Sequence, residues 1–322
     1  MLTVLGTTTL DIFIRGVDAM PEQGDAEFSN RSLVWLDRPV LPTLGGNGAN
    51  AAYAAGALGN DVRLWSCIGA DPFGDMVLGW LKNRNVDTSD MHMSTSAGTS
   101  TTVVVTDTLL RRNSFHYPGP VSEFAPTARS AGTGHGGDCL LVTGYPLLQK
   151  WRGEATRHLL REAHSHGVRT ALDIGPMIGP PVTVEELEPL LPSVDILFCN
   201  EFELGEVTGS EPRQGARWAL SAGAQMVVVK RGEQGAAIFS AEGSTQIEVP
   251  CFPVRAIGTV GAGDSFDAGF LYAYDRGSSS GESARFASAV AALVVSAPRG
   301  ILDAPDADAV RAFLASRDGR QE

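Results

Sequence analysis

The stretch CLLVTG at 139–144, with GEATRHLLREAHSHG at 153–167 and VRTALDI at 168–174, decides the fold class. Two short apolar runs flank one segment with helical spacing. That segment places Leu159 and Ala163 on one face, with Arg and His residues on the other, as expected for a helix that covers a sheet. A strand, a helix and a second strand in this order form the crossover that joins parallel strands.

The same alternation continues in both directions along the chain. Short β-branched and apolar runs, each followed by a segment of helical period, recur at 2–6, 62–69, 194–200 and 225–230. Runs of this kind suit buried parallel strands that are joined by helical crossovers. We therefore expect an α/β fold with a parallel sheet covered by helices.

Two stretches break the alternation. Residues 12–43 and 99–118 contain alternating segments rich in Thr, Val and aromatic residues, with turn residues between them. This pattern favours antiparallel strands over helical crossovers. We expect 1–322 to form a single domain in which these two insertions build a small accessory β layer.

Composition sets limits on partners. The chain has 322 residues, of which 43% are hydrophobic, and 25 Lys and Arg residues against 37 Asp and Glu residues give a net charge of −12. This hydrophobic content predicts a packed core. The acidic balance, without a basic cluster, argues against nucleic acid and against an anionic membrane as partners. A bound phosphate would need local backbone amides, a metal ion or a few cations.

The N-terminus and the cysteines bear on the compartment. Residues 1–16 carry neither a basic leader nor an apolar stretch of signal-peptide length. The four cysteines are widely spaced, form no C-x-x-C pair and are expected to be reduced core residues. We expect a cytoplasmic protein.

The string GTVGAGDSFDAGF at 258–270 carries the strongest chemical signal. Gly261, Ala262 and Gly263 remove side-chain bulk where a helix begins, so that backbone amides can converge on an anion. Asp264 in the first turn could then act as a base beside a bound phosphoryl group. Alternatively, Asp264 is an ordinary first-turn acid that is favourable to the helix dipole.

A second glycine-rich string, LGGNGANAAYAAGALG, spans 44–59. Gly45 and Gly46 allow the backbone to approach a ligand closely, while Asn47 and Asn50 offer amides suited to vicinal hydroxyls. The alternative is a turn followed by a packing helix with an Asn N-cap.

Asn200 and Glu203 follow a predicted buried strand and lie three residues apart. On one helix face they could hold Mg²⁺, directly or through its waters, near a nucleotide triphosphate. Asn-x-x-Glu at a helix start also resembles a capping box, which requires no ligand.

Three further residues are weaker candidates. Asp11 is expected at the carboxyl end of the first parallel strand, where it could accept hydrogen bonds from sugar hydroxyls, or it is a turn residue. Lys230, at the start of a glycine-containing turn between two strands, could reach a phosphate, although a plain hairpin explains the pattern equally well. Arg112 in the second insertion faces either substrate or solvent.

Several enzyme classes lack their defining residues. The six histidines show no metal-ligand spacing, so a structural or catalytic zinc site is not expected. The Walker loop that defines P-loop NTPases is not present in the sequence.

Four motifs, taken in order, resemble the ribokinase-like (PfkB) carbohydrate kinase family: LGGNGAN near 45, NEFE near 200, KRGEQGA near 230 and GTVGAGDSF near 260. The resemblance covers nearly the whole chain. It implies an ATP-dependent kinase with a Rossmann-like parallel sheet between helices. It also implies a small β lid, formed here by 12–43 and 99–118, that closes over the sugar and often mediates a homodimer.

The resemblance also assigns roles to residues. It implies that Asp264 is the base beside an anion hole, and that Asn200 and Glu203 place Mg²⁺ and phosphate. The implied acceptor site, together with the neighbours chosen above, comprises Asp11, Gly45, Gly46, Asn47, Asn50 and Arg112. The implied wall of the ATP site comprises Lys230, Gly232, Gly235, Ser288 and Ala292.

The chain departs from the family pattern at several positions. Gly258 and Val260 stand where members commonly have Asp and Thr, so activation by a monovalent cation is in doubt and we predict weak or absent K⁺ dependence. Asn47 stands where ribokinase has a lysine, and Ser288 replaces a frequent Asn. The sugar is therefore not securely ribose, and the neutral Asn47 favours an unphosphorylated acceptor.

The leading hypothesis is ATP-dependent phosphorylation of a hydroxymethyl group on a sugar or sugar-like alcohol. A nucleoside kinase is the nearest rival, with the base stacked on Trp35, Phe115 or Tyr117. A dinucleotide-binding oxidoreductase would need its glycine fingerprint after an early strand, where this chain has GTTTLD. A non-catalytic sugar-binding regulator is the remaining alternative, against which the retained Asp264 argues.

Overall fold

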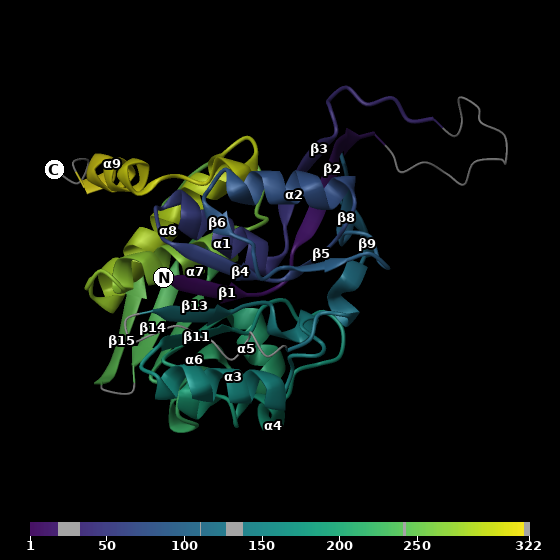
Figure 1. Cartoon of the computed structure of the whole chain (residues 1–322). Coiled ribbons are helices and arrows are strands. Elements are labelled where there is room, and N and C mark those ends of the chain that lie inside the picture. The colour runs from purple at the N-terminus through teal and green to yellow at the C-terminus, as the bar shows by residue number, and fades with distance from the viewer. Residues whose placement is uncertain (19–32, 110, 127–137, 241–242, 319–322) are drawn as a thin grey trace.

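A large sheet, a smaller sheet and their covering helices make up most of the described part of the molecule. The computed structural model describes residues 1–18, 33–109, 111–126, 138–240 and 243–318. A large sheet runs through the middle with helices on both faces, and a smaller sheet lies at one end of it (Figure 1). This confirms the α/β fold that the alternation of strand and helix segments predicts.

In the described part of the chain, the large sheet has nine strands in the order β15-β14-β13-β12-β11-β10-β1-β4-β6. Neighbours from β13 to β6 pair in parallel, whereas β14 and β15 add an antiparallel edge. The predicted hairpin after Lys230 is thus present. The strands are β1 (Leu2–Leu5), β4 (Val62–Trp65), β6 (Val86–Asp87), β10 (Cys139–Val142), β11 (Arg169–Asp173), β12 (Ile196–Asn200), β13 (Met226–Lys230), β14 (Ala236–Ser240) and β15 (Gly243–Val249).

Helices bury both faces of this sheet. On one face lie α1 (Asn47–Ala57), α2 (Pro72–Lys82), α7 (Ala262–Tyr274) and α8 (Ser280–Ser296), with α9 (Ala307–Asp318) outside α8. On the other lie α3 (Glu154–Ser165), α4 (Val184–Leu187), α5 (Glu201–Thr208) and α6 (Pro212–Ser221). Short 3₁₀ turns are η1 (Gly119–Ser122), η3 (Tyr145–Leu147), η4 (Leu191–Ser193), η5 (Gly232–Gln234) and η6 (Gly300–Asp303).

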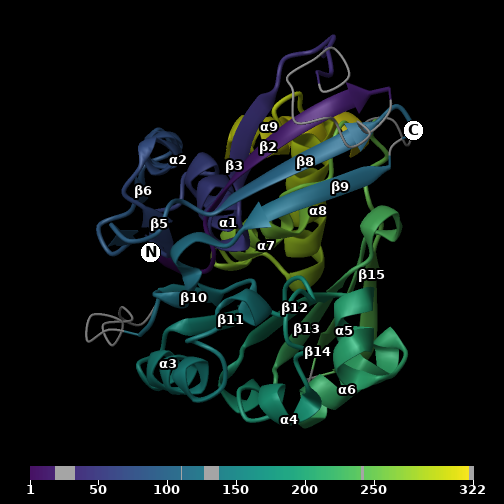
Figure 2. The same cartoon turned by 90° about the vertical axis from the view of Figure 1, so that its right-hand side faces the viewer.

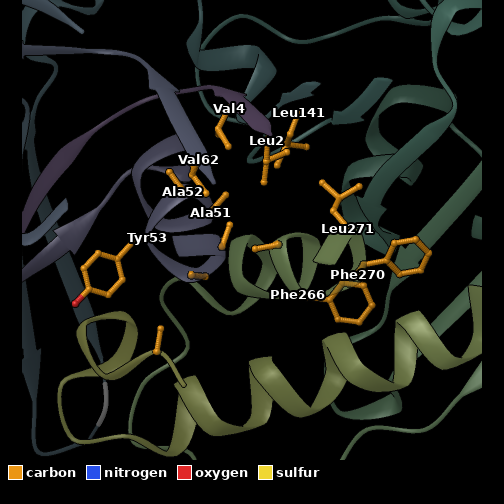
Figure 3. Close-up of a cluster of buried hydrophobic side chains, with 14 of the residues drawn as sticks. Leu2, Val4, Ala51, Ala52, Tyr53, Val62, Leu141, Phe266, Phe270 and Leu271 are labelled. Atoms are coloured by element: carbon orange, nitrogen blue, oxygen red, sulfur yellow. The ribbon is translucent and has the colours of Figure 1, made fainter. Parts of the chain in front are cut away.

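The core between the sheet and the first group of helices fixes the positions of α1 and α7. Ala51 and Ala52 of α1 pack with Leu271 of α7 beneath Val4 of β1 (Figure 3). Alanines allow α1 to lie close to the sheet, so the N-termini of α1 and α7 are brought to the same region. Burial of this apolar surface is the main force that holds the two helices there.

The smaller sheet has the order β3-β2-β8-β9, with β2 (Thr9–Val17), β3 (Leu41–Gly45), β8 (Thr101–Asp107) and β9 (Arg112–Tyr117). Both predicted insertions contribute to it (Figure 2). The expectation of purely antiparallel strands is wrong for the central pair, because β2 and β8 run parallel. Each insertion supplies one antiparallel pair, and the two pairs then join edge to edge. Residues 19–32 of the first insertion lie outside the described residues.

Three smaller expectations also need correction. The run 62–69 is not one strand, since β4 ends at Trp65 and β5 (Cys67–Gly69) pairs with β7 (His92–Ser94) in a separate two-stranded sheet. Cys251 is partly exposed, whereas the other three cysteines are buried. Asp11 lies inside β2 instead of at the end of the first parallel strand.

Among the described residues, no helix has the length and apolar character needed to cross a membrane.

Candidate active site

The two glycine-rich strings meet at the carboxylate of Asp264. Asn47 Nδ2 donates to Asp264 Oδ1 at 2.8 Å, and Asn50 Nδ2 donates to Asp264 Oδ2 at 2.9 Å. Both amides lie in the first turn of α1, while Asp264 lies in the first turn of α7, more than 200 residues away in sequence. Both asparagines thus donate to the predicted base. The sequence did not indicate these two hydrogen bonds.

Asp264 is 7% exposed, and its surroundings shift its protonation. Burial raises the pKa of Asp264 to about 6, although the hydrogen bonds from Asn50 and Asn47 favour the charged form and lower it. The carboxyl group is therefore mostly ionised at neutral pH. A carboxylate with a pKa just below the working pH, fixed by two donors, has the properties of a general base.

The start of α7 leaves backbone amides available. Its N-cap, Gly261, adopts φ = +79° and provides no side-chain cap. The amide of Ala262 donates to Thr259 O at 3.3 Å, and that of Ser265 donates to Gly261 O at 2.9 Å. Within the described part of the chain, the amides of Gly263 and Asp264 have no backbone acceptor. An anion at this helix start would therefore be received mainly by the second and third amides, with Ala262 already engaged.

Gly45 and Gly46 are required by close packing. A Cβ atom on Gly45 would lie 2.3 Å from Asp11 Oδ2. Gly46 has φ = +84°, and a Cβ atom there would lie 2.6 Å from Thr7 O. The first glycine therefore makes room for the Asp11 carboxyl group, and the second allows the backbone to turn into α1.

Asp11 faces the same space as Asp264, although it comes from the smaller sheet. It is 9% exposed, and burial raises the pKa of its carboxyl group to about 6, with a hydrogen bond to Thr102 opposing and the charge of Asp264 adding to the shift. Close by, the side-chain oxygen of Asn50, Oδ1, is buried without a partner in the described structure. Buried acceptors are normally satisfied, and this atom could accept a hydrogen bond from a ligand hydroxyl.

Lys230 is held by two buried carboxylates. Its Nζ lies 2.8 Å from Asp173 Oδ1 and 3.0 Å from Asp267 Oδ2. Burial alone would lower the pKa of Lys230, but the two carboxylates raise it well above its usual value. A Cβ atom on Gly263 would lie 3.5 Å from Nζ, so the ammonium group is next to the open amides of α7.

The sequence reasoning missed Asp173 and Asp267, although signals for both exist. Asp173 ends β11, and the carboxyl ends of parallel strands meet at the ligand-binding edge of such sheets. Asp267 lies three residues after Asp264 in the same helix, which brings the two to one face.

Asn200 and Glu203 form the capping box that the alternative interpretation described. Asn200 Oδ1 accepts from the Glu203 amide at 2.8 Å, and Glu203 Oε2 accepts from the Asn200 amide at 2.7 Å. Glu203 is nevertheless unusual for a capping residue, because burial and the charge of Asp173 raise its pKa to about 7. Among the described residues, no group of three or more His, Cys, Asp or Glu side chains converges in the manner of a metal site.

The remaining candidates lie around this centre. Gly232 begins the η5 turn after Lys230 and Gly235 follows that turn, where a Cβ atom on Gly235 would lie 2.0 Å from Val249 O. Ser288 and Ala292 are buried on α8, which packs along α7. Arg112 is exposed on β9, directly opposite Thr106.

Two of the aromatic residues named for the nucleoside alternative, Phe115 and Tyr117, do not face this site. Phe115 pairs with Val103 and Tyr117 with Thr101, so both lie on the face of the smaller sheet opposite to Asp11 and Thr102. Trp35 is 83% exposed. Phe115 and Tyr117 are therefore not positioned to stack on an acceptor that contacts Asp11.

Known proteins resemble this chain along its whole length. The model of the pfkB family carbohydrate kinases matches residues 27–307. A nucleoside kinase of Methanothermobacter thermautotrophicus is 29% identical over 98% of this chain and 96% of its own. An ATP-dependent ribose-1-phosphate kinase of Halopiger xanaduensis is 28% identical over 97% of each chain.

The fold has equally extensive counterparts. The structure of Arabidopsis thaliana ribokinase with ribose and ATP superposes with a TM-score of 0.82 and 24% identity, over 97% of this chain and 98% of that one. The arrangement of the large and the smaller sheet is thus a fold that this chain shares with that ribokinase. This chain belongs to the pfkB family of carbohydrate kinases, and it is an ATP-dependent kinase of a sugar or nucleoside.

Proposed function

We propose that the protein transfers the γ-phosphoryl group of ATP to a hydroxymethyl group of a sugar or sugar-like alcohol. The observation that carries the proposal is the Asp264 carboxylate, which two asparagine amides hold at the mouth of an uncapped helix start. Phosphoryl transfer needs in-line positioning and neutralised charge more than covalent help from the protein.

The chemical step needs one base and one anion site. The acceptor O–H gives its proton to an Asp264 carboxylate oxygen as the acceptor oxygen forms its bond to the γ-phosphorus. The bond from the γ-phosphorus to the bridging oxygen breaks, and ADP leaves with that electron pair. The amides of Gly263 and Asp264, with Gly261 allowing the turn and the Lys230 ammonium close by, would stabilise the charge on the moving phosphoryl group.

Acceptor and nucleotide approach this centre from different elements. Asp11 and the unpartnered Asn50 Oδ1 are placed to bind acceptor hydroxyls, with Gly45 and Gly46 leaving space for them. Asn47 contributes by orienting the base. We assign the nucleotide wall to the η5 turn and α8, specifically to Lys230, Gly232, Gly235, Ser288 and Ala292.

Asn200 and Glu203 would place Mg²⁺ through its waters, with Glu203 as the anionic member. The donor set fits this ion, because Mg²⁺ keeps several waters and takes only one or two carboxylates alongside substrate phosphates. Mg²⁺ supplies charge neutralisation on the phosphates when bound. Burial and the charge of Asp173 raise the pKa of Glu203 to about 7 although Lys230 opposes the shift, and a bound cation would favour the ionised form of this carboxyl group.

The smaller sheet would act as a lid and as a dimer interface. Closing over the acceptor would exclude water, which otherwise competes for the phosphoryl group. Its outer face presents partly exposed apolar residues, with Phe115 65% exposed, and we assign this face to a second copy of the chain. Phe115→Glu would then give monomers in light scattering, whereas an unchanged mass would argue against this interface.

A coupled assay of ADP release tests the function directly. The panel would contain pentoses, hexoses, sugar acids, phosphosugars and nucleosides, each with ATP and Mg²⁺. Acceptor-dependent ADP release from at least one sugar-like alcohol is expected, and phosphorus NMR of the product would locate the new ester. Turnover confined to nucleosides would establish the second candidate, which the 29% identical nucleoside kinase favours. ADP release independent of any acceptor would contradict the proposal.

A further inference from the structure

A cavity of about 1210 Å³ lies beside the proposed acceptor site. Its walls are the smaller sheet, the loop 253–260 and the segment 296–301. The basic residues that line it are Arg15, Arg38, Arg112, Arg255, Arg299 and Arg317. Among its described lining residues the sole acid is Asp107, which is already bonded to Arg111. A cavity with an excess of positive charge is unexpected in a chain with a net charge of −12.

Among the residues that the structure describes, most of these guanidinium groups have no counter-ion. Arg299 pairs with Asp303 at 2.6 Å, and Arg38 lies 3.9 Å from Asp37. The other four arginines of the cavity make no ion pair within the described residues. Surface arginines commonly point singly into solvent, but several unpaired ones around one cavity create a local field that attracts an anion.

The cavity continues the acceptor site along one face of the smaller sheet. Asp11, Phe13 and Arg15 alternate along β2 and therefore share a face. Asp11 pairs with Thr102, whereas Arg15 pairs with Thr106, which in turn lies opposite Arg112 on β9. One end of this face thus carries the carboxylate next to Asp264, and the other end, about 13 Å along the strand, carries the arginines.

Two contacts join the cavity to the catalytic loop. Residues 258–260 line it and lead directly into Gly261, the N-cap of α7. A Cβ atom on Gly258 would lie 3.4 Å from Arg15 Nη2, so the guanidinium group rests on this loop. Thr43, opposite Asp11 on β3, also lines the cavity, and its buried hydroxyl has no partner among the described residues.

We propose that the arginine cavity binds a phosphate group carried by the acceptor at the end remote from its hydroxymethyl group. This inference rests on the proposed kinase function and narrows its substrate class to sugar phosphates with a free hydroxymethyl group. The hydroxyls would contact Asp11 and Asn50, and the phosphate would lie between Arg15, Arg112 and Arg255. One planar guanidinium group can donate two parallel hydrogen bonds to two oxygens of a phosphate, which gives both affinity and orientation.

From the sequence, the neutral side chain of Asn47 favoured an unphosphorylated acceptor. The structure removes the reason for that prediction. The Asn47 amide donates to Asp264 and is already committed to the base. Its lack of charge therefore says nothing about the acceptor. The charge that would recognise a phosphate comes from other strands and loops, namely β2, β9 and residues 253–260.

The test compares matched acceptors in the ADP-release assay: ribose with ribose 1-phosphate, and fructose with fructose 6-phosphate. The phosphorylated member of at least one pair is expected to have the higher kcat/KM. Arg15→Gln, Arg112→Gln and Arg255→Gln should each lower the kcat/KM ratio of phosphorylated to neutral acceptor by about 10- to 100-fold, the scale of one charge-assisted contact. Arg161→Gln, on the exposed surface of α3, is the matched control and should leave the ratio unchanged.

Because the readout is a ratio within each variant, partial misfolding does not imitate the effect. Equal or lower kcat/KM for both phosphorylated acceptors would overturn the inference and leave the kinase function intact. Inorganic phosphate shows whether the cavity binds the phosphate group of the acceptor or a separate anionic effector. Competitive inhibition by inorganic phosphate against the phosphorylated acceptor supports the proposal, whereas non-competitive inhibition or activation contradicts it. If no sugar-like acceptor of the wider panel is turned over, the proposed transfer to a sugar hydroxymethyl group is contradicted. Calorimetric titration of ribose 1-phosphate into wild type and Arg15→Gln then still decides whether the cavity binds phosphate.

Discussion

The N-termini of α5 and α7 carry an acid at the same helical position and use it in opposite ways. Glu203 and Asp264 are both the third residue after the N-cap. In α5 the N-cap is Asn200, and the acid folds back to complete a reciprocal capping box. In α7 the N-cap is Gly261, which has no side chain, and the acid turns away to Asn47 and Asn50. The first helix start is closed by its own residues, whereas the second remains open.

The difference shows where to look for chemistry in such folds. A satisfied N-terminus contributes stability, and its acid can be explained without a ligand. An unsatisfied N-terminus at a buried position carries a free-energy cost that a ligand can remove.

Replacing the acid at the open start has the largest expected effect. Asp264→Asn should lower turnover by on the order of 10²-fold or more, because the base is lost while the shape is kept. Binding of ATP and acceptor, measured by calorimetry, should stay near the wild-type values. Glu203→Gln, the equivalent change at the closed start, is the matched comparison and should affect turnover less. Near-wild-type turnover of Asp264→Asn would remove this residue from the mechanism.

Removing a hydrogen-bond donor from Asp264, at the open N-terminus of α7, should shift the dependence of kcat on pH. Turnover requires the ionised Asp264, whose pKa is about 6, so kcat is expected to fall as the pH drops through this value. Asn47→Ala removes a hydrogen bond that favours the ionised form and should raise the pKa of Asp264. The acid limb of kcat against pH would then shift upward. Asn200→Ala removes the side-chain amide that caps α5 and should leave the acid limb of kcat against pH unchanged. If the acid limb of Asn47→Ala is also unchanged, Asn47 does not act on kcat through the pKa of Asp264.

Opening the closed start should mainly cost stability. Asn200→Ala removes the cap of α5 and is expected to destabilise the fold by about 1 kcal/mol. Glu203→Gln keeps an acceptor for the Asn200 amide and removes the charge, so it separates capping from metal placement. If these residues place Mg²⁺, both changes raise the Mg²⁺ concentration needed for half-maximal turnover. A lower melting temperature with an unchanged Mg²⁺ requirement would leave capping as their sole role.

The smallest expected effect concerns monovalent cations at the loop before α7. We predict that exchanging Na⁺ for K⁺ leaves turnover essentially unchanged. Gly258 supplies no carboxylate there, and the Arg15 guanidinium beside it repels a second cation. Steady-state rates at constant ionic strength check this. A large rise in turnover with K⁺ would contradict it.

The fold could be predicted because its signals are local. Each parallel strand and its crossover helix can be recognised within about 30 residues, and the stretch 139–174 became β10, α3 and β11 as expected. The parallel pairing of β2 with β8 could not be predicted in this way, since it joins residues about 90 positions apart without a local turn to fix the direction.

The candidate site was predictable in its residue types and less so in its contacts. The glycine strings and Asp264 could be selected from their chemistry, and Asn200 with Glu203 from their spacing. The bonds from Asn47 and Asn50 to Asp264 depend on how α1 and α7 pack, which no local pattern encodes. The role of Asp173 beside Lys230 likewise depends on two strands, β11 and β13, that are separated by β12 in the sheet.

The alternation of Asp11, Phe13 and Arg15 along β2 has a consequence for acceptor length. A hydrogen-bonded strand is stiff, and a common displacement of the sheet would carry the residues at its two ends together. The separation between the hydroxyl-binding end and the cationic end is therefore set by the strand itself. An acceptor too short to reach both ends would gain only one set of contacts, so the protein would select its substrate by size as well as by charge.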